Sequence, residues 1–337
     1  MISRLIKSMI KRIIFSSCLL FSCCALAQFP SQQEFAAQTA KKYPISEDHV
    51  SSLLQQANKN QKVLDAISRP WEAKPWYKYW PIFLTEKRIK AGVKFWLKHQ
   101  TTLERVEKEL GVDAAIVVAI IGVETFYGTY KGKYKALDSL YTLGFHHQGR
   151  GKFFRKQLAE LMVLSNEEQL DIHQLYGSYA GAMGWGQFIP SSYRHYAIDF
   201  DGDNKRDLFN NEVDAIGSVG NYFKQHKWQF GEPVAFPAKV KGNTYQTLLR
   251  KKLKPVDKVA AILDKQVYIE ADVNTQAKGQ LLELETETGV EHWLTLNNFY
   301  VISRYNHSPL YSMAVYQLSE KIKAAKQQVN MTVAVQP

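Results

Sequence analysis

The segment Ala114-Ala-Ile-Val-Val-Ala-Ile-Ile-Gly-Val-Glu-Thr-Phe-Tyr-Gly128 decides how this chain folds. Its first ten residues carry no charge, which is typical of a helix that is buried on every side. Asp113 suits the N-cap position and Gly128 suits the end of the helix, so we predict a helix over 114–126. Glu124 stands at the end of this apolar run, where partial desolvation would raise the pKa of its carboxyl group.

A carboxylic acid that keeps its proton near neutral pH can protonate the leaving oxygen of a glycoside. Glu124 is therefore a candidate general acid. The alternative is a glutamate that only reaches water at the helix end, which is the usual position of this residue type.

The segments on either side of this helix also indicate helices. Ser46 and Thr85 precede apolar positions at helical spacing and are expected to start helices. Pro70, Pro75 and Pro81 argue against a regular helix over 69–81. Further helices are expected over 151–164, 166–175, 212–226 and 311–325.

The stretch 231–296 has a different pattern. Val267-Tyr-Ile-Glu-Ala and Leu282-Glu-Leu-Glu-Thr-Glu alternate apolar and polar residues, and Thr288-Gly289 marks a turn before Val290. This pattern predicts a small β unit that contains a hairpin with one face in water.

The first residues indicate export. Arg4, Lys7, Lys11 and Arg12 precede an apolar stretch, and Ala25-Leu-Ala27 is a small-residue cleavage site. Residues 1–27 are therefore predicted to be a signal peptide. The alternatives are an anchor helix that is kept and, because Leu20-Phe-Ser-Cys23 resembles a bacterial lipobox, lipidation at Cys23.

Composition supports an exported protein. All three cysteines lie before residue 25, so cleavage leaves neither disulfides nor a thiol nucleophile. The formal net charge is +11, and the predicted signal peptide removes four basic residues and no acidic ones. A basic chain favours anionic surroundings such as cell wall, anionic lipid or nucleic acid, and charge does not choose among them.

A glycine-rich block, Gly177-Ser-Tyr-Ala-Gly-Ala-Met-Gly-Trp-Gly-Gln-Phe-Ile-Pro-Ser-Ser-Tyr193, follows the apolar helix in the sequence. Glycine lets a backbone approach a ligand closely. Aromatic rings offer flat faces to sugars, and Ser and Gln offer hydrogen bonds. The alternative is a purely structural turn.

These blocks together resemble the lytic murein transglycosylase B family. The resemblance rests on four segments in family order: Gly122–Gly128, Ala180–Tyr193, Asp214–Phe223 and Asn298–Ser308. It implies a mainly α (α+β) fold with a lysozyme-like helical core, additional helices and a small inserted β subdomain. The expected division is 1–27 signal peptide, 28–112 helical region, 113–230 catalytic core, 231–297 β subdomain and 298–337 closing segment.

The resemblance also implies functional residues. Glu124 corresponds to the single catalytic acid/base, and Ser178 and Gln187 correspond to groups that hold N-acetyl sugars. The implied cleft lining is Met183, Phe188, Tyr222, Tyr305, Asn306, Tyr311 and, by a weaker match, Tyr79. Trp185 stands where relatives often have tyrosine.

The implied reaction cleaves the β-1,4 bond between N-acetylmuramic acid and N-acetylglucosamine in peptidoglycan. The C6 hydroxyl of the muramic acid attacks in place of water and leaves a 1,6-anhydro end. One glutamate suffices, whereas hydrolases normally need two carboxylates, and Asp138 is the only other acid near Glu124 in sequence. The alternatives are a hydrolytic muramidase and a non-catalytic wall-binding protein.

The resemblance further implies peptidoglycan glycan strands as the partner and no nucleic acid. The expected location is the periplasm of a Gram-negative bacterium, with Cys23 as the alternative lipid anchor to the outer membrane. We expect a monomer.

An acidic loop predicts a calcium site. Asp199, Asp201, Asp203 and Asp207 occupy positions one, three, five and nine of an EF-hand-like spacing, with the backbone of Lys205 at position seven. Asn204 replaces glycine and Asn210 replaces the bidentate glutamate, so we expect weak binding at ~10⁻⁴ to 10⁻³ M. The resemblance implies a structural Ca²⁺ with no catalytic role, and the alternative is a solvated acidic turn.

Overall fold

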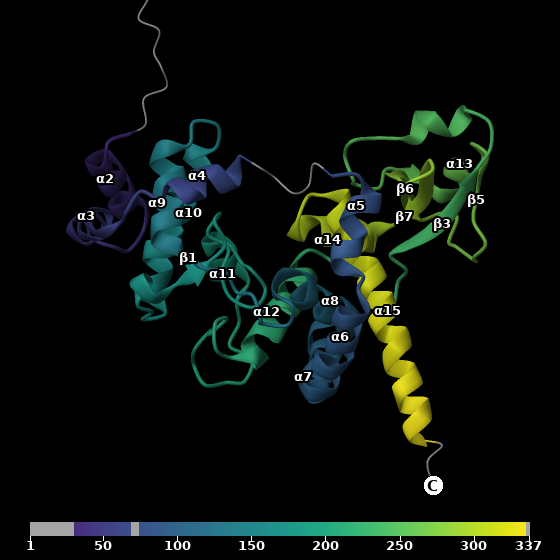
Figure 1. Cartoon of the computed structure of the whole chain (residues 1–337), viewed down its shortest axis with the longest axis horizontal. Coiled ribbons are helices and arrows are strands. Elements are labelled where there is room, and N and C mark those ends of the chain that lie inside the picture. Colours follow the sequence, from purple (N-terminus) through teal and green to yellow (C-terminus); the bar gives the residue numbers. More distant parts are fainter. Residues whose placement is uncertain (1–29, 69–73, 335–337) are drawn as a thin grey trace, which may run out of the picture.

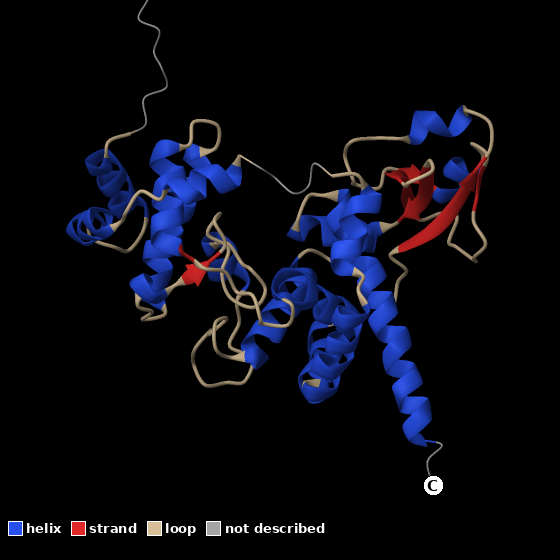
Figure 2. Ribbon diagram, in the orientation of Figure 1, coloured by secondary structure: helices blue, strands red, loops and turns tan. Residues whose placement is uncertain are grey.

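The computed structural model describes residues 30–68 and 74–334. The predicted signal peptide and Cys23 lie outside these residues. Helices dominate the molecule, and a small sheet lies at one end (Figure 1, Figure 2). This confirms the predicted mainly α fold class with a small β subdomain. Among the residues described, no helix has both the length and the apolar character needed to cross a bilayer.

The apolar helix α8 (Ala114–Thr125) lies at the centre of the fold. Every one of its residues is buried except Glu124. It packs against α6 (Glu86–Lys98), α12 (Glu212–Gln225) and α15 (Pro309–Ala334). The core around α8 therefore joins segments from the beginning, the middle and the end of the chain.

The other helices lie in two groups on either side of α12 (Figure 1). The first group is α2 (Gln32–Lys42), α3 (Glu47–Gln56), α4 (Gln61–Ile67), α9 (Ala136–His146), α10 (Gly151–Glu167), η3 (Ile172–Gln174) and α11 (Pro190–Tyr196), with the short strands β1 (Tyr134–Lys135) and β2 (Tyr176–Gly177). The second group extends the core with α5 (Trp76–Phe83), α7 (Gln100–Arg105), η2 (Val106–Leu110) and α14 (Asn297–Tyr305).

The predicted helix starts at Ser46 and Thr85 are confirmed. Ser46 accepts a hydrogen bond from the backbone N–H of His49, and Thr85 accepts one from Arg88. Asp113 occupies the N-cap position of α8, but its carboxylate accepts hydrogen bonds from Trp228 Nε1 and Gly231 N instead of capping the helix.

Two helix predictions were wrong. No helix covers 166–175, because α10 ends at Glu167 and Gln169 adopts a left-handed conformation with φ of 53°. Conversely, α5 continues through Pro81 to Phe83. Proline removes only one N–H donor, and the next bond, from Leu84 N to Trp80 O, is retained.

The β subdomain is a five-stranded sheet in the order β4-β6-β7-β3-β5 with an accompanying helix (Figure 1). Its elements are β3 (Ala235–Val240), η4 (Thr244–Leu248), β4 (Asp257–Lys258), α13 (Val259–Leu263), β5 (Val267–Tyr268), β6 (Lys278–Glu285) and β7 (Val290–Thr295). The hairpin of β6 and β7 confirms the predicted β unit. Each neighbouring pair of strands is antiparallel.

The expected wet face of the hairpin is present near the turn, where Glu283 and Glu285 are exposed, but not at the other end. There Leu281 packs into a small core with Val259 and Ile262 of α13, whereas Leu282 and Leu284 on the opposite face join the main core. Both faces of the hairpin are therefore covered at the end away from the turn. This anchors the subdomain to the helical body.

Candidate active site

Glu124 lies in the last turn of α8 and is held by a tyrosine from the far end of the chain. The hydroxyl of Tyr311 donates a hydrogen bond to Glu124 Oε1 at 2.6 Å. Burial raises the pKa of Tyr311 well above its usual value, and the negative charge of Glu124 raises it further. Tyr311 therefore keeps its proton and remains a donor to the carboxylate.

Three further aromatic residues pack next to this pair. The Tyr305 hydroxyl donates to the backbone oxygen of Gly186 at 2.5 Å. Its ring centroid lies 4.7 Å from that of Tyr222 and 5.8 Å from that of Phe188. Burial, followed by the charge of Glu124, raises the pKa of Tyr305. Glu124 is thus the carboxylate whose field acts on both tyrosine hydroxyls.

The end of α8 differs from the predicted stop at Gly128. The helix ends at Thr125, and Phe126, Tyr127 and Gly128 all have positive φ angles of 49°, 56° and 82°. The left-handed conformation costs about 1–2 kcal/mol for a residue with a side chain. The turn is closed by the bond from Gly128 N to Thr125 Oγ1 at 2.9 Å.

Close contacts with neighbouring side chains explain why glycine occupies two positions in and near this turn. A Cβ atom at Gly122 would collide with the Tyr127 side chain, and one at Gly128 would collide with the indole of Trp185. The sequence Gly122–Gly128 therefore specifies close packing around the turn that follows Glu124.

The glycine-rich block forms a tight turn between Met183 and Phe188. The two residues exchange backbone hydrogen bonds of 2.9 Å, and both side chains are buried. Gln187 has a φ of 50°, and its Nε2 donates to Gly184 O at 3.0 Å. Ser178 Oγ accepts from the backbone N of Ala182 at 3.1 Å. These side chains hold the backbone of the block in place.

The remaining predicted lining residues are also placed near this region by the fold. Tyr79, on α5, is buried, and its electrostatic interaction with Tyr311 is a minor contribution to the raised pKa of Tyr311. Asn306 follows α14, and its Oδ1 accepts from Ser308 N at 3.1 Å. Asp138, the other acid considered, accepts from Asn58 N at 2.8 Å and so tethers the segment before α4.

Thr125 and Trp185 connect Glu124 to the segment after the acidic loop, and the sequence analysis missed both roles. Thr125 is fully buried, and its Oγ1 lies 3.0 Å from Trp185 O. Trp185 in turn donates from its backbone N to Leu208 O at 3.0 Å and from Nε1 to Phe209 O at 3.2 Å. The sequence offered one signal for the role of Thr125, which is that a threonine directly follows the candidate catalytic glutamate at the end of an apolar helix.

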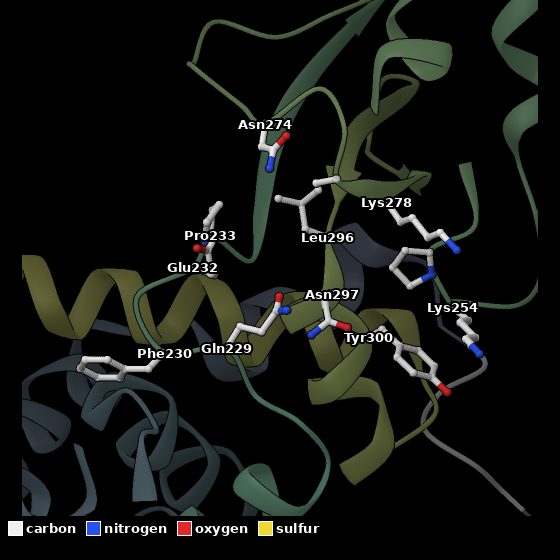
Figure 3. A pocket seen from close by; sticks show the side chains of 12 residues that line it. Gln229, Phe230, Glu232, Pro233, Lys254, Asn274, Lys278, Leu296, Asn297 and Tyr300 are labelled. Atoms are coloured by element: carbon white, nitrogen blue, oxygen red, sulfur yellow. The ribbon is translucent and has the colours of Figure 1, made fainter. Parts of the chain in front are cut away.

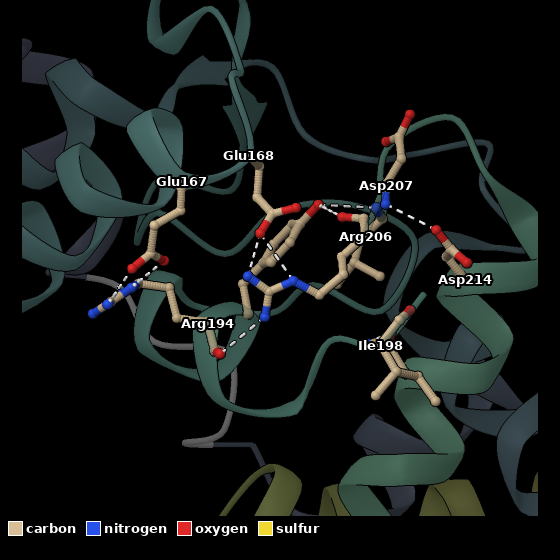
Figure 4. A network of polar contacts seen from close by, with 10 residues as sticks. Glu167, Glu168, Arg194, Ile198, Arg206, Asp207 and Asp214 are labelled. Carbon is tan, nitrogen blue, oxygen red and sulfur yellow. Dashed lines mark hydrogen bonds and ion pairs between the residues drawn. The ribbon is translucent and has the colours of Figure 1, made fainter. Parts of the chain in front are cut away.

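That segment is fixed by an ion-pair network (Figure 4). Arg206 pairs with Glu168, and Arg194 pairs with Glu167 at 2.7 Å. The side-chain bond to Glu167 raises the pKa of Arg194, which therefore stays charged. The network ties the acidic loop to the end of α10.

The acidic loop gathers a different set of carboxylates from the predicted one. Oxygen atoms of Asp199, Asp201, Asp203 and Asp214 lie within 4.8 Å of one another. Asp207 is not in this cluster, because its carboxylate accepts from Phe209 N at 2.8 Å and from Asn210 N at 3.0 Å.

Asp214 takes the place that the linear spacing assigned to Asp207. It lies in the first turn of α12, is fully buried and accepts from Phe200 N at 2.7 Å. Burial raises the pKa of Asp214. Its sequence position resembled that of an ordinary acid at a helix start, which is why it was missed.

The cluster fits a hard cation. Calcium takes oxygen ligands at about 2.3–2.6 Å, so oxygens on opposite sides of the ion lie about 4.6–5.2 Å apart. The left-handed φ of 69° at Asn204 agrees with its predicted role in place of glycine. The backbone N of Lys205 donates to Asp203 Oδ1 at 2.9 Å.

Comparisons with known proteins identify the family of the chain. The model of the transglycosylase SLT domain family matches residues 28–320. The chain is 37% identical to "Membrane-bound lytic murein transglycosylase B" of Escherichia coli K12 over 90% of this chain and 85% of that protein.

Solved structures of similar proteins share the fold. The soluble lytic transglycosylase SltB1 of Pseudomonas aeruginosa is 43% identical, with a TM-score of 0.82 over 88% of this chain and all of that one. The Escherichia coli lytic transglycosylase Slt35 in complex with calcium is 36% identical, with a TM-score of 0.80 over 90% and 95% of the two chains. The predicted lysozyme-like core is confirmed by these similarities. The chain belongs to the transglycosylase SLT domain family.

Proposed function

We propose that the chain is a lytic transglycosylase that cleaves the β-1,4 bond between N-acetylmuramic acid and N-acetylglucosamine in peptidoglycan. The observation that carries this proposal is Glu124, the one residue of α8 that is not buried, held by the Tyr311 hydroxyl. The family and the relatives named above support the same activity.

In the proposed reaction, Glu124 gives its proton to the glycosidic oxygen as the bond to the muramic C1 breaks. The substrate N-acetyl group stabilises the positive charge that develops at C1. Glu124 then takes the proton from the muramic C6 hydroxyl, whose oxygen bonds to C1 and closes the 1,6-anhydro ring. Because the nucleophile belongs to the substrate, proximity replaces the second carboxylate of a hydrolase.

The surrounding residues would position these groups. We expect Ser178, Gln187 and Asn306 to shape the backbone that meets the sugars, and Tyr311 to orient the carboxylate. Met183, Phe188, Tyr222 and Tyr79 are buried and would act by supporting this surface.

We place the enzyme in the bacterial envelope, acting as a monomer on glycan strands in the periplasm after removal of residues 1–27. Lipidation at Cys23 is the alternative route to the outer membrane. We also propose the predicted domain limits, with a catalytic core over 113–230 and a β subdomain over 231–297.

The nature of the product tests this function. Sacculi digested in ¹⁸O-water should yield 1,6-anhydro muramic ends that carry no label, because no water adds to the bond. Mass spectrometry of the muropeptides measures this, and a lysozyme digest of the same sacculi provides the labelled reducing ends for comparison. Mainly ¹⁸O-labelled reducing ends from this chain would establish a muramidase instead.

We further propose that Asp199, Asp201, Asp203 and Asp214 bind a structural Ca²⁺. The donor set is made of carboxylate oxygens, the ligands that calcium prefers. The ion would neutralise the mutual repulsion of these carboxylates and would hold the loop that leads to Leu208 and Phe209.

Calcium should raise the melting temperature. At about ten times Kd, a ligand bound only by the folded state adds about 1.4 kcal/mol, or roughly 2 °C for a chain of this size. Differential scanning calorimetry with and without millimolar Ca²⁺ measures the rise, which Asp201→Asn and Asp214→Asn should abolish.

Two controls separate the observed cluster from the linear spacing. Asp272→Asn, at an exposed position in the β subdomain, should keep the full rise. Asp207→Asn should lower stability but keep the calcium response. Loss of the response in Asp207→Asn but not in Asp214→Asn would contradict the assignment.

A further inference from the structure

A cavity of about 770 Å³ lies between the β subdomain and the first turn of α14 (Figure 3). This volume is within the range of small-molecule and peptide sites. One wall is the loop that leads from α12 to β3, another is the β subdomain, and the floor is the start of α14. The proposed cleavage reaction gives this cavity no role.

The wall that follows α12 is rigidly held. Asn298 is fully buried, and its Oδ1 accepts from Gln229 N at 2.9 Å. Its Nδ2 donates to the backbone oxygens of Gln229 at 2.7 Å and Glu232 at 3.0 Å. Leu296 N also bonds to Val234 O at 3.0 Å. The cavity is therefore a preformed feature of the fold.

The chemistry of the lining is that of a peptide site with a preference for carboxylates. Lys254 and Lys278 both line the cavity, and neither side-chain amino group makes an ion pair or hydrogen bond with any residue in the described ranges. Figure 3 shows their amino groups on the same side of the cavity as the Tyr300 hydroxyl. Glu232 adds one carboxylate, so the charged groups include both signs with an excess of positive charge.

The neutral part of the lining fits peptide groups. Gln229, Asn274 and Asn297 supply carboxamides, each of which can donate to a carbonyl and accept from an N–H. Phe230, whose side chain is 54% exposed, offers an apolar ring at the edge. On intact strands the lactyl carboxyl group of each muramic acid is amide-bonded to its stem, so the free carboxylates that could pair with the lysines belong to the peptide stems.

The cavity also shares its supporting helices with the active site. Tyr300 and Tyr305 lie on α14 about 7.5 Å apart along the helix axis, and Tyr305 contacts Gly186 O in the glycine-rich block. Gln229 follows α12, which carries Tyr222. A group bound in the cavity would therefore lie on the same rigid unit as the cleavage machinery.

We propose that this cavity binds the peptide stem of peptidoglycan, with Lys254 and Lys278 receiving its carboxylates, Glu232 facing an ammonium group and the carboxamides pairing with its peptide groups. This inference rests on the proposed function for the identity of the peptide. It makes the chain selective for strands that still carry stems.

The experiment compares two substrates with two double variants. Lys254→Gln with Lys278→Gln should raise KM for peptide-bearing strands about tenfold with unchanged kcat, because two partly exposed ion pairs are lost. KM should stay unchanged for strands that an amidase has stripped of their stems and whose freed lactyl carboxylates have then been blocked as methyl amides. Lys251→Gln with Lys252→Gln removes the same charge from exposed positions outside the cavity and should change neither value.

Binding of stem peptides released by the amidase, measured by calorimetry on Glu124→Gln protein, keeps the test independent of cleavage. The cavity variant should bind these peptides about tenfold more weakly than its parent. Two results would overturn the proposal. One is an equal rise in KM of the cavity variant for stripped and for peptide-bearing strands, and the other is an unchanged affinity of the cavity variant for the peptides. If the wild type makes no anhydro product but binds the peptides through both lysines, the proposed function fails and the site stands.

Discussion

Glu124→Gln should abolish cleavage of peptidoglycan while leaving the protein folded. A single carboxyl group serves as both acid and base in the proposed reaction, and general acid–base catalysis alone contributes about 10²–10⁴-fold. We therefore expect a loss of roughly 10³-fold or more in kcat. The amide oxygen of glutamine can still accept the hydrogen bond of Tyr311, so the melting temperature should remain within about 2 °C.

Release of soluble muropeptides from sacculi measures the rate, and sedimentation with sacculi measures binding, which should persist. Glu287→Gln, at an exposed position in the turn between β6 and β7, is the matched control and should retain full activity. Activity in Glu124→Gln above a few per cent of wild type would assign the acid to another residue.

Gly132→Ala should destabilise the fold severely. Gly132 has a φ of 102°, and a Cβ atom there would overlap the backbone carbonyl of Gly177, which cannot move as a side chain can. Strain and overpacking together cost about 3–5 kcal/mol, which corresponds to a fall of roughly 5–8 °C in melting temperature. Because Ser178 follows Gly177, cleavage should weaken as well.

Gly231→Ala isolates the contribution of the backbone angle. Gly231 also has a positive φ, 73°, but its Cβ would point into open space. That substitution should cost only about 1 kcal/mol. Thermal unfolding of the two variants separates the effects, and equal shifts would show that the contact with Gly177 is not the cause.

The sequence alone determined the central helix, the position of Glu124 and the location of the β unit. A run of ten uncharged residues between a helix N-cap and a glycine is typical of a helix buried on all sides, and the alternation in 282–287 is typical of a strand. The family resemblance added a candidate list, of which Phe188 and Tyr222 pack against Tyr305. These features are local in the chain, and local pattern was enough to find them.

Some local predictions failed because tertiary contacts outweighed them. Pro81 stays inside a helix, and Leu281 is buried on the face of the hairpin that was predicted to be wet. Packing against α13 covers that part of the face. Helix and strand propensities describe an isolated segment. In the folded protein, the free energy gained by burying a segment against its neighbours exceeds the cost of a single lost hydrogen bond.

Only the tertiary structure decided which distant groups meet. Tyr311 and Glu124 are 187 positions apart, and no spacing rule links them. Asp214 joins the acidic loop from the next helix, where it replaces Asp207, because α12 turns its first residues back towards the loop. Lys254 and Tyr300 likewise line one cavity from two units of the fold. Sequence periodicity describes one element at a time, and the site lies where several elements pack together.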